Sequence, residues 1–342
     1  MKRAKCLIMI LGFQVLFMNP LPAQKDRVKY VPSYNDPVLK QMKIIRDSIK
    51  AVEDSLTGTI RTQLDKNKKD QEDCERTLRF DFTGVTKPAS PDVFKAAFHL
   101  PPVAQYNTGT CWAFAGTSLV EAEVARLQGL QIKLSEMYMV YYEYLEKCRY
   151  FVHQRGAFHL SQGSEPNTVF RLIKSYGIVP HDLYPGYAGD EKYDHSCLSH
   201  EIRTYLQYIK DNDFWDEALV IATVKLILNK YMGEPPATLI YEERTMTPMI
   251  FVREILKFNP DDYAGVISTY TLPFYTRGEL EVDDNWWHDS TYYNLPLDIW
   301  YDLLRQGLEG GLTAVLGGDV SEPGYNGFED AAVIPDFDIP QA

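Results

Sequence analysis

The 342-residue sequence lacks the short motifs that mark several common kinds of binding site. It has no Gly-x-Gly-x-x-Gly stretch and no P-loop, so no nucleotide cofactor is indicated. It has no Cys-x-x-Cys pair and no His/Cys cluster with the spacing of a zinc site. The formal net charge of −12 argues against nucleic acid or an anionic membrane as a partner. We therefore expect no cofactor, no metal and no nucleic-acid partner.

Cysteine is scarce, with five residues in the chain. Cys6 lies in the N-terminal apolar run, which leaves Cys74, Cys111, Cys148 and Cys197. If Cys111 is a free nucleophile, the other three cannot all be paired, which argues against a disulfide scaffold even in an oxidising compartment.

Long apolar runs are also missing beyond the N-terminus, where no stretch approaches the ~18 residues of a membrane span. Residues 1–23 combine a basic start, a short apolar run from Cys6 to Phe17 and a small residue, Ala23. This order is typical of a secretory signal peptide, with an uncleaved anchor as the alternative. We therefore expect an exported mature chain, periplasmic or extracellular, with no membrane partner after cleavage.

The stretch from Gln105 to Ala115 (QYNTGTCWAFA) is the most informative part of the chain. An apolar run without proline follows Cys111 and predicts a helix that begins at this residue. A cysteine at a helix N-terminus lies among unpaired N–H groups at the positive end of the macrodipole, which favours the thiolate. The Gln105 amide and the Cys111 backbone N–H are candidates to stabilise an oxyanion. The alternative is a buried structural cysteine.

Residues 108–112 (TGTCW) resemble the local signature of papain-like cysteine peptidases at Gly, Cys and Trp. The longer pattern Q-x-x-x-G-x-C-W-x-F-A is more similar to the bleomycin hydrolase and aminopeptidase C branch. The resemblance covers about residues 93–342. Further stretches resemble that branch: Leu134–Glu136 with Leu145–Lys147, Ile173–Pro180, Gly233–Pro236 with Thr247-Pro248, Asn294–Leu297 and Gly318–Val320.

This resemblance implies an α+β, papain-like two-lobe fold with Cys111 on the helical lobe, a sheet lobe and a helical insertion. The expected organisation is a signal peptide (1–23), a helical extension and linker (24–90) and a peptidase domain (91–342), with the insertion at about 199–262.

Hydrophobic spacing adds element predictions. An amphipathic helix should run from Val38 to Leu56, capped by Asp36; a coiled coil or a propeptide is an alternative role. A second helix should start at the Ser135 cap, and another should start after Asn167. Two strands should lie at Ala264–Tyr275 and Leu312–Leu316.

The resemblance also implies the activity. Cys111 would be the nucleophile of a cysteine peptidase, most similar to an aminopeptidase, and Gln105 would serve the oxyanion hole. Gln162-Gly163-Ser164 replaces a Gly-Gly pair whose backbone binds substrate, so Gly163, Ser164 and Trp112 are the implied substrate-binding residues. Peptides are the implied substrates, and the branch's hexamers imply a homo-oligomer.

The catalytic His and Asn of such a peptidase are missing from their expected places. No histidine occurs between His200 and His288, and none follows Gly318-Asp319-Val320, after which the resemblance places the pair. His288, next to Asn285-Trp286-Trp287, is an alternative base with the wrong order and spacing. We expect residues 283–289 to form a polar, aromatic loop instead. We expect surface or core roles for the remaining downstream histidines: His153, His159, His181, His195 and His200.

Two interpretations remain for this missing base. The first is a C-terminally incomplete peptidase. The second is an inactive papain fold that acts as a binding or interaction protein.

Overall fold

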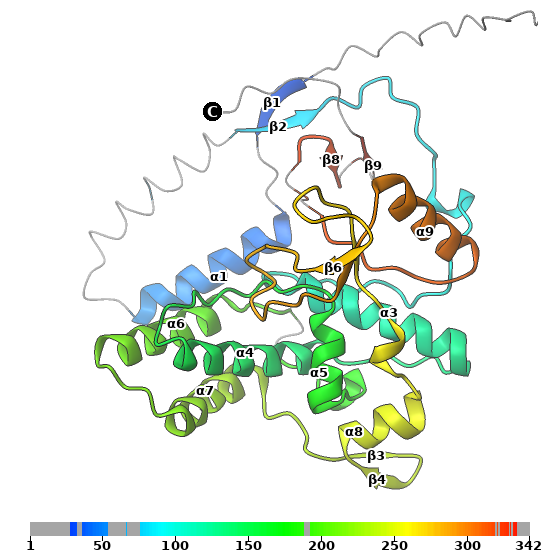
Figure 1. The fold of residues 1–342 in the computed structure, drawn as a ribbon. Coiled ribbons are helices and arrows are strands. Elements are labelled where there is room, and N and C mark those ends of the chain that lie inside the picture. The colour runs from blue at the N-terminus through cyan, green and yellow to red at the C-terminus, as the bar shows by residue number, and fades with distance from the viewer. Residues whose placement is uncertain are drawn as a thin grey trace, which may run out of the picture. The chain divides into compact units, whose positions relative to one another are not determined.

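A computed structural model describes residues 28–32, 36–53, 66, 76–187, 192–318, 320, 322–327, 329 and 331–333 (Figure 1). The predicted signal peptide at residues 1–23 lies outside these residues. The chain forms two compact units that are described separately below. The smaller unit comprises Met1–Tyr34, Thr57–Ala89 and Asp319–Ala342, and the larger comprises Asn35–Leu56 and Ser90–Gly318. Helices and small sheets occur together, as the predicted α+β class requires.

The smaller unit is built from short strands. Strand β1 (Val28–Pro32) pairs antiparallel with β2 (Arg76–Phe80), and β8 (Tyr325–Asn326) pairs antiparallel with β9 (Ala331–Ala332). The Phe80 backbone N–H donates to the Pro323 carbonyl at 2.8 Å, so residues far apart in sequence share this unit. The sequence analysis predicted no strands in this part of the chain.

Helix α1 (Pro37–Glu53) belongs to the larger unit and confirms the predicted N-terminal helix. The Asp36 carboxylate accepts from the backbone N–H groups of Val38 and Leu39 at 2.7 and 3.2 Å, the expected N-cap. Several apolar side chains of this helix remain exposed, among them Ile45 and Ile49.

Five helices form the core of the larger unit: α3 (Cys111–Gln128), α4 (Glu136–His153), α5 (Thr168–Tyr176), α6 (Ser196–Asp211) and α7 (Glu217–Met232). Thirteen of the 18 residues of α4 are buried, so this helix is surrounded by its neighbours. It starts at Ser135, whose hydroxyl accepts from the Tyr138 N–H at 3.0 Å, as predicted. The predicted helices after Cys111 and after Asn167 are likewise confirmed.

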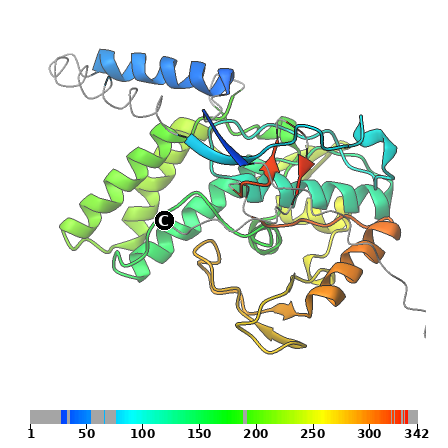
Figure 2. The ribbon, with the colours of Figure 1, turned by 90° about the horizontal axis from the view of Figure 1, so that it is seen from above.

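The rest of the larger unit contains short elements. They are the hairpin β3 (Leu239–Tyr241) and β4 (Arg244–Met246), α8 (Pro248–Phe251) with a π-helical turn η3 (Val252–Leu256), the three-stranded sheet β5 (Val266–Ile267), β7 (Tyr292–Asn294) and β6 (Thr276–Gly278), α9 (Leu297–Glu309), and the 3₁₀ turns η1 (Pro91–Val93), η2 (His181–Leu183) and η4 (Pro260–Asp262). Figure 2 shows α9 and the β6–β7 strands, in orange, away from α6 and α7.

The strand predictions in this region are largely wrong. Within 264–275 only Val266–Ile267 is a strand, because the Asn294 side-chain amide donates to the carbonyls of Thr269 and Leu272 at 2.9 and 2.8 Å. These carbonyls therefore bond to a side chain instead of to a neighbouring strand. Residues 312–316 are irregular, since no strand of the described chain pairs with them.

Among the described residues, no helix is both long and apolar enough to cross a membrane.

Candidate active site

Cys111 is the first residue of α3, and it is free and exposed. The N-cap residue Thr110 makes no side-chain cap bond, because its hydroxyl is hydrogen-bonded to that of Thr108 at 2.7 Å. The Thr110 side chain therefore leaves the first backbone N–H groups of this 18-residue helix without a cap, next to Cys111. This arrangement places the thiol at the positive end of the helix dipole, as the sequence predicted, and excludes the buried structural role.

Gln105 is held within the same turn. Its amide Nε2 donates to the Thr108 carbonyl at 2.7 Å, while the Thr108 hydroxyl donates to the Gln105 carbonyl at 3.0 Å. A glutamine amide has two N–H groups. The Thr108 carbonyl binds one of them, and no described residue accepts from the other, which is therefore available to a ligand. The geometry is compatible with an oxyanion donor, although the role itself stays a prediction.

The turn before Cys111 is tied to the start of α6. Asn107 and Asp194 form an isolated parallel bridge, and the Asn107 Nδ2 donates to Asp194 Oδ1 and to Ser196 Oγ, each at 2.8 Å. The His195 N–H donates to the Asn107 carbonyl at 3.2 Å. The sequence analysis missed this attachment, because the two segments are 87 residues apart and carry no shared motif.

The Trp112 side chain is buried, and its indole N–H donates to the Gln162 carbonyl at 3.0 Å. It therefore supports the segment that contains Gly163 and Ser164 from inside the lobe. A part for Trp112 in substrate binding remains a prediction.

Ser164 is also turned inward. Its hydroxyl donates to Glu143 Oε1 at 2.7 Å and contacts the Thr168 hydroxyl at 2.9 Å. The serine that replaces the second glycine of the family pair thus keeps its side chain out of solvent, which leaves its backbone for the predicted substrate contact. The Gly163 carbonyl accepts from the Lys147 ammonium, whose pKa is lowered by burial.

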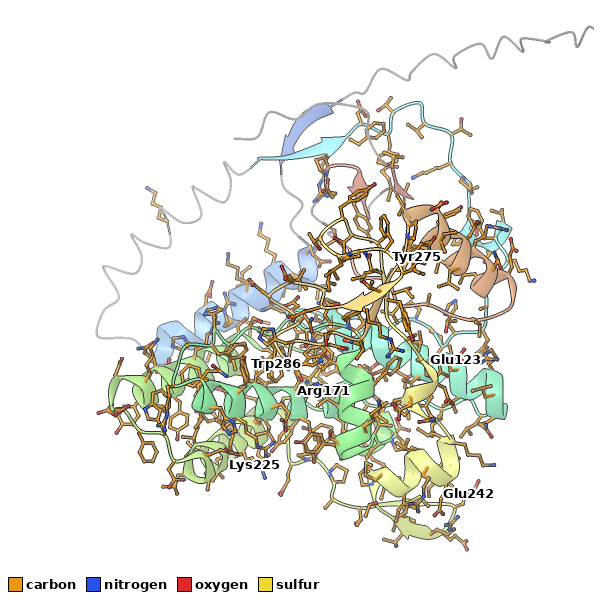
Figure 3. The ribbon with its side chains drawn as sticks, viewed as in Figure 1. Glu123, Arg171, Lys225, Glu242, Tyr275 and Trp286 are labelled. Carbon is orange, nitrogen blue, oxygen red and sulfur yellow. The ribbon has the colours of Figure 1, made fainter. Side chains whose placement is uncertain are left out.

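A segment from the other end of the unit packs on this region. The Trp286 indole N–H donates to Glu143 Oε1 at 2.6 Å, and the Arg171 guanidinium lies 5.2 Å from the Trp286 ring centroid. Figure 3 shows Arg171 and Trp286 next to each other. A Cβ added at Gly163 would come within 2.3 Å of Asp284 Oδ1, so only glycine lets the Asp284 carboxylate approach so closely. The predicted polar, aromatic loop at 283–289 therefore has a buried anchor, Trp286.

No histidine of the described chain hydrogen-bonds to the Cys111 thiol. His288 is exposed and its Nδ1 contacts Glu279 Oε1 at 2.7 Å. His195 is 3% exposed, and burial lowers its pKa to about 4 despite the nearby Asp194. Neither residue is positioned beside Cys111 as a general base.

Of the other two described cysteines, Cys148 differs from Cys111 in its burial, whereas Cys197 is exposed like Cys111. Burial raises the pKa of the Cys148 thiol to about 12, so this thiol is unreactive at neutral pH. Cys197 is free and exposed on α6. Cys6 and Cys74 lie outside the described residues.

Comparison with known proteins supplies the family. Residues 88–229, which contain Cys111, the Gln162–Ser164 segment and helices α3 to α6, match the model of the papain family cysteine proteases. This segment belongs to the papain family. The resemblance noted from the TGTCW motif is thereby confirmed.

The relatives that this chain matches are peptidases of the expected branch. "Cysteine proteinase 1, mitochondrial" of Saccharomyces cerevisiae is 24% identical over 221 residues, 51% of this chain and 45% of the relative. Aminopeptidase C of Lactobacillus delbrueckii subsp. lactis is 22% identical, over 64% of this chain and 58% of the relative. The chain thus spans about half the length of the relatives that it matches. None of them supports the alternative of an inactive binding protein.

The fold is confirmed in the same way. The crystal structure of PepW from Lactobacillus rhamnosis matches with a TM-score of 0.53 and 20% identity, over 65% of this chain and 59% of that chain. At this identity the likeness shows the papain-like fold and nothing further.

The expected export is corrected by these relatives. A secretory signal had implied a periplasmic or extracellular protein, whereas the matching yeast protein is named mitochondrial. A basic, apolar N-terminus is shared by several kinds of targeting segment, so composition alone does not decide the compartment.

Proposed function

We propose that this chain provides the nucleophile lobe of a cysteine aminopeptidase similar to bleomycin hydrolase, and that Cys111 attacks the scissile amide. The observation that carries the proposal is the exposed Cys111 at the first position of α3, six residues after a glutamine whose amide is fixed by the Thr108 carbonyl. Peptides with a free N-terminus are the proposed substrates, and a homo-oligomer is the proposed assembly.

The proposed chemistry follows from these positions. The Cys111 sulfur bonds to the substrate carbonyl carbon, and the negative charge moves to the carbonyl oxygen. The second Gln105 N–H and the Cys111 backbone N–H stabilise that oxygen. The C–N bond then breaks, the amine leaves with a proton, and water hydrolyses the thioester. Proton transfer requires a general base, which no histidine of the described chain supplies to Cys111.

The remaining site residues take supporting parts in the proposal. The backbones of Gly163 and Ser164 would pair with the substrate main chain, while Trp112 would hold this segment through the Gln162 carbonyl. The proposed domain organisation is an extension and linker at 24–90 before a peptidase domain at 91–342, with the helical insertion at about 199–262.

Two assays test this function. The first is labelling with a short thiol-reactive epoxide at pH 6, read by peptide mass spectrometry. We expect labelling at Cys111 that is lost in Cys111→Ser, while folded protein without labelling would contradict the proposal. The second is hydrolysis of aminoacyl amides with free or acetylated N-termini, which, unlike labelling, also requires the general base. A preference for the free amine supports an aminopeptidase, equal rates indicate an endopeptidase, and Gln105→Ala should lower kcat/KM by about 10²-fold.

A further inference from the structure

Gln162 is hydrogen-bonded to the chain around Cys111 at two points, although the sequence analysis gave this residue no role of its own. Its backbone carbonyl accepts from the Trp112 indole N–H, and its side-chain Oε1 accepts from the Gly109 backbone N–H, each at 3.0 Å. One residue therefore holds the chain on both sides of Cys111, two residues before it and one residue after it.

The orientation of the Gln162 amide is fixed by its partners. A backbone N–H can only donate, so the atom facing Gly109 is the carbonyl oxygen. The amide nitrogen then donates to Ser199 Oγ at 2.9 Å, and that hydroxyl contacts the Tyr144 hydroxyl at 3.1 Å. Ser199 and Tyr144 are both buried, on α6 and α4, so the amide is anchored in the core of the lobe.

The glycine of the TGTCW motif is explained by the same contact. A Cβ added at Gly109 would lie 3.0 Å from the Gln162 Cβ, tighter than an ordinary van der Waals contact. Gly109 thus allows the turn to pack closely against Gln162. The hydrogen bond from the Gly109 N–H fixes the backbone between Thr108 and the start of α3, and Thr108 is the residue whose carbonyl accepts from the Gln105 amide.

We infer that Gln162 is a positioning residue, which holds the turn before Cys111 so that the thiol and the Gln105 amide keep their reactive geometry. This inference rests on the proposed function. It assigns to Gln162 a role separate from that of the neighbouring Gly163 and Ser164. Gln162 acts through the Gly109 N–H and does not itself contact the substrate.

The test compares thiol reactivity in matched variants of the full chain. Gln162→Met keeps the length and apolar stem of the side chain but removes both amide bonds. Ser199→Ala removes only the hydroxyl that orients the amide and leaves every contact of the turn in place. Gln207→Met is the control, because Gln207 is an exposed glutamine of α6 that bonds only to Asp211 within the described chain. The measurement is the rate of alkylation by iodoacetamide at pH 6, resolved by peptide.

Cys197 is the internal reference, since it is exposed and lies on the helix that Gln162 contacts through Ser199. We expect Gln162→Met to slow alkylation of Cys111 about tenfold, the effect of losing roughly one net hydrogen bond from the reactive geometry. Ser199→Ala should slow it less, Gln207→Met should not change it, and Cys197 should react at the wild-type rate in all variants. A merely structural role would change both cysteines together.

The possible outcomes distinguish a failure of the Gln162 positioning role from a failure of the proposed peptidase function. Wild-type Cys111 that reacts faster than Cys197, with unchanged rates in Gln162→Met and Ser199→Ala, would overturn the positioning role alone. Wild-type Cys111 that reacts no faster than Cys197 would count against both. If Gln162→Met does not fold, as judged by circular dichroism, Ser199→Ala decides the question, because an unchanged Cys111 rate in that variant overturns the inference.

Discussion

Helices α4 and α9 are both rich in apolar and aromatic residues, yet they are buried to very different degrees. Thirteen residues of α4 are buried, whereas none of the 13 residues of α9 is. Leu303 and Leu308 of α9 are about half exposed, and its Trp300 donates to the Val266 carbonyl at 3.3 Å. An amphipathic pattern therefore predicts a helix and its apolar face, but the degree of burial depends on what packs against that face.

Charged side chains also differ in burial between the two regions to which these helices belong. The helical lobe (residues 111–232) buries ionised groups in networks, such as Glu143 with Arg171 and Lys147 with backbone carbonyls. The strand segment (residues 265–316) keeps its ion pairs at the surface, such as Arg305 with Asp302. Buried pairs are costly to break because one charge is left in low dielectric, while exposed pairs contribute little. The candidate site is built on the lobe that contains the buried networks.

The largest expected difference between the two regions comes from Glu143→Gln. Glu143 is 2% exposed and accepts from Ser164, Arg171 and Trp286. Its loss leaves the Arg171 guanidinium without its ion-pair partner and leaves Asp284 as the remaining carboxylate near the buried Lys147, so we expect the free energy of unfolding to fall by about 3–5 kcal/mol. Urea unfolding followed by tryptophan fluorescence measures this change. Glu279→Gln is the matched control in the strand segment and should unfold like the wild type.

An equal loss in both variants would contradict the view that burial separates the two regions. A stable Glu143→Gln protein with altered Trp286 fluorescence would mean that the network holds only the 283–289 loop.

A smaller difference should come from truncating one leucine in each region. Leu172 on α5 is fully buried, so Leu172→Ala leaves a cavity and should lower the free energy of unfolding by about 3 kcal/mol. Leu303 on α9 is 50% exposed, and Leu303→Ala should cost less than about 1 kcal/mol. The midpoints of urea unfolding compare the two variants directly. A cost for Leu303→Ala that matches Leu172→Ala would show that α9 is buried in solution.

The sequence predicted the helical lobe better than the strand segment, for a physical reason. Helices are specified by local signals, and the Asp36 and Ser135 caps and the start at Cys111 were all predicted from nearby residues. Strands need a partner that is distant in sequence, and the Asn294 amide takes carbonyls that a strand partner would otherwise use.

In the candidate site, too, local features were predictable from the sequence and long-range contacts were not. The local motif placed Cys111 and Gln105 in one turn, which the structure confirms as geometry. The motif gave no sign that Gln162 bonds to Gly109 or that Asn107 bonds to Asp194, because these contacts join segments 53 and 87 residues apart. Only residue types at short spacing can be recognised from one sequence.

The smallest expected effect concerns pH and a buried histidine of the helical lobe. Burial lowers the pKa of His195 to about 4, below the ~6.5 of an unfolded histidine. Between these values the unfolded chain binds a proton that the folded chain does not, so the stability contributed by neutral His195 is complete above pH 6.5 and is lost as the pH falls toward 4. At pH 5 the loss is about 2 kcal/mol. We expect wild type to lose about that much more stability than His195→Gln between pH 7 and pH 5, measured by urea unfolding at both values. Parallel losses would show that water reaches the His195 ring, which would make this part of the lobe resemble the exposed strand segment.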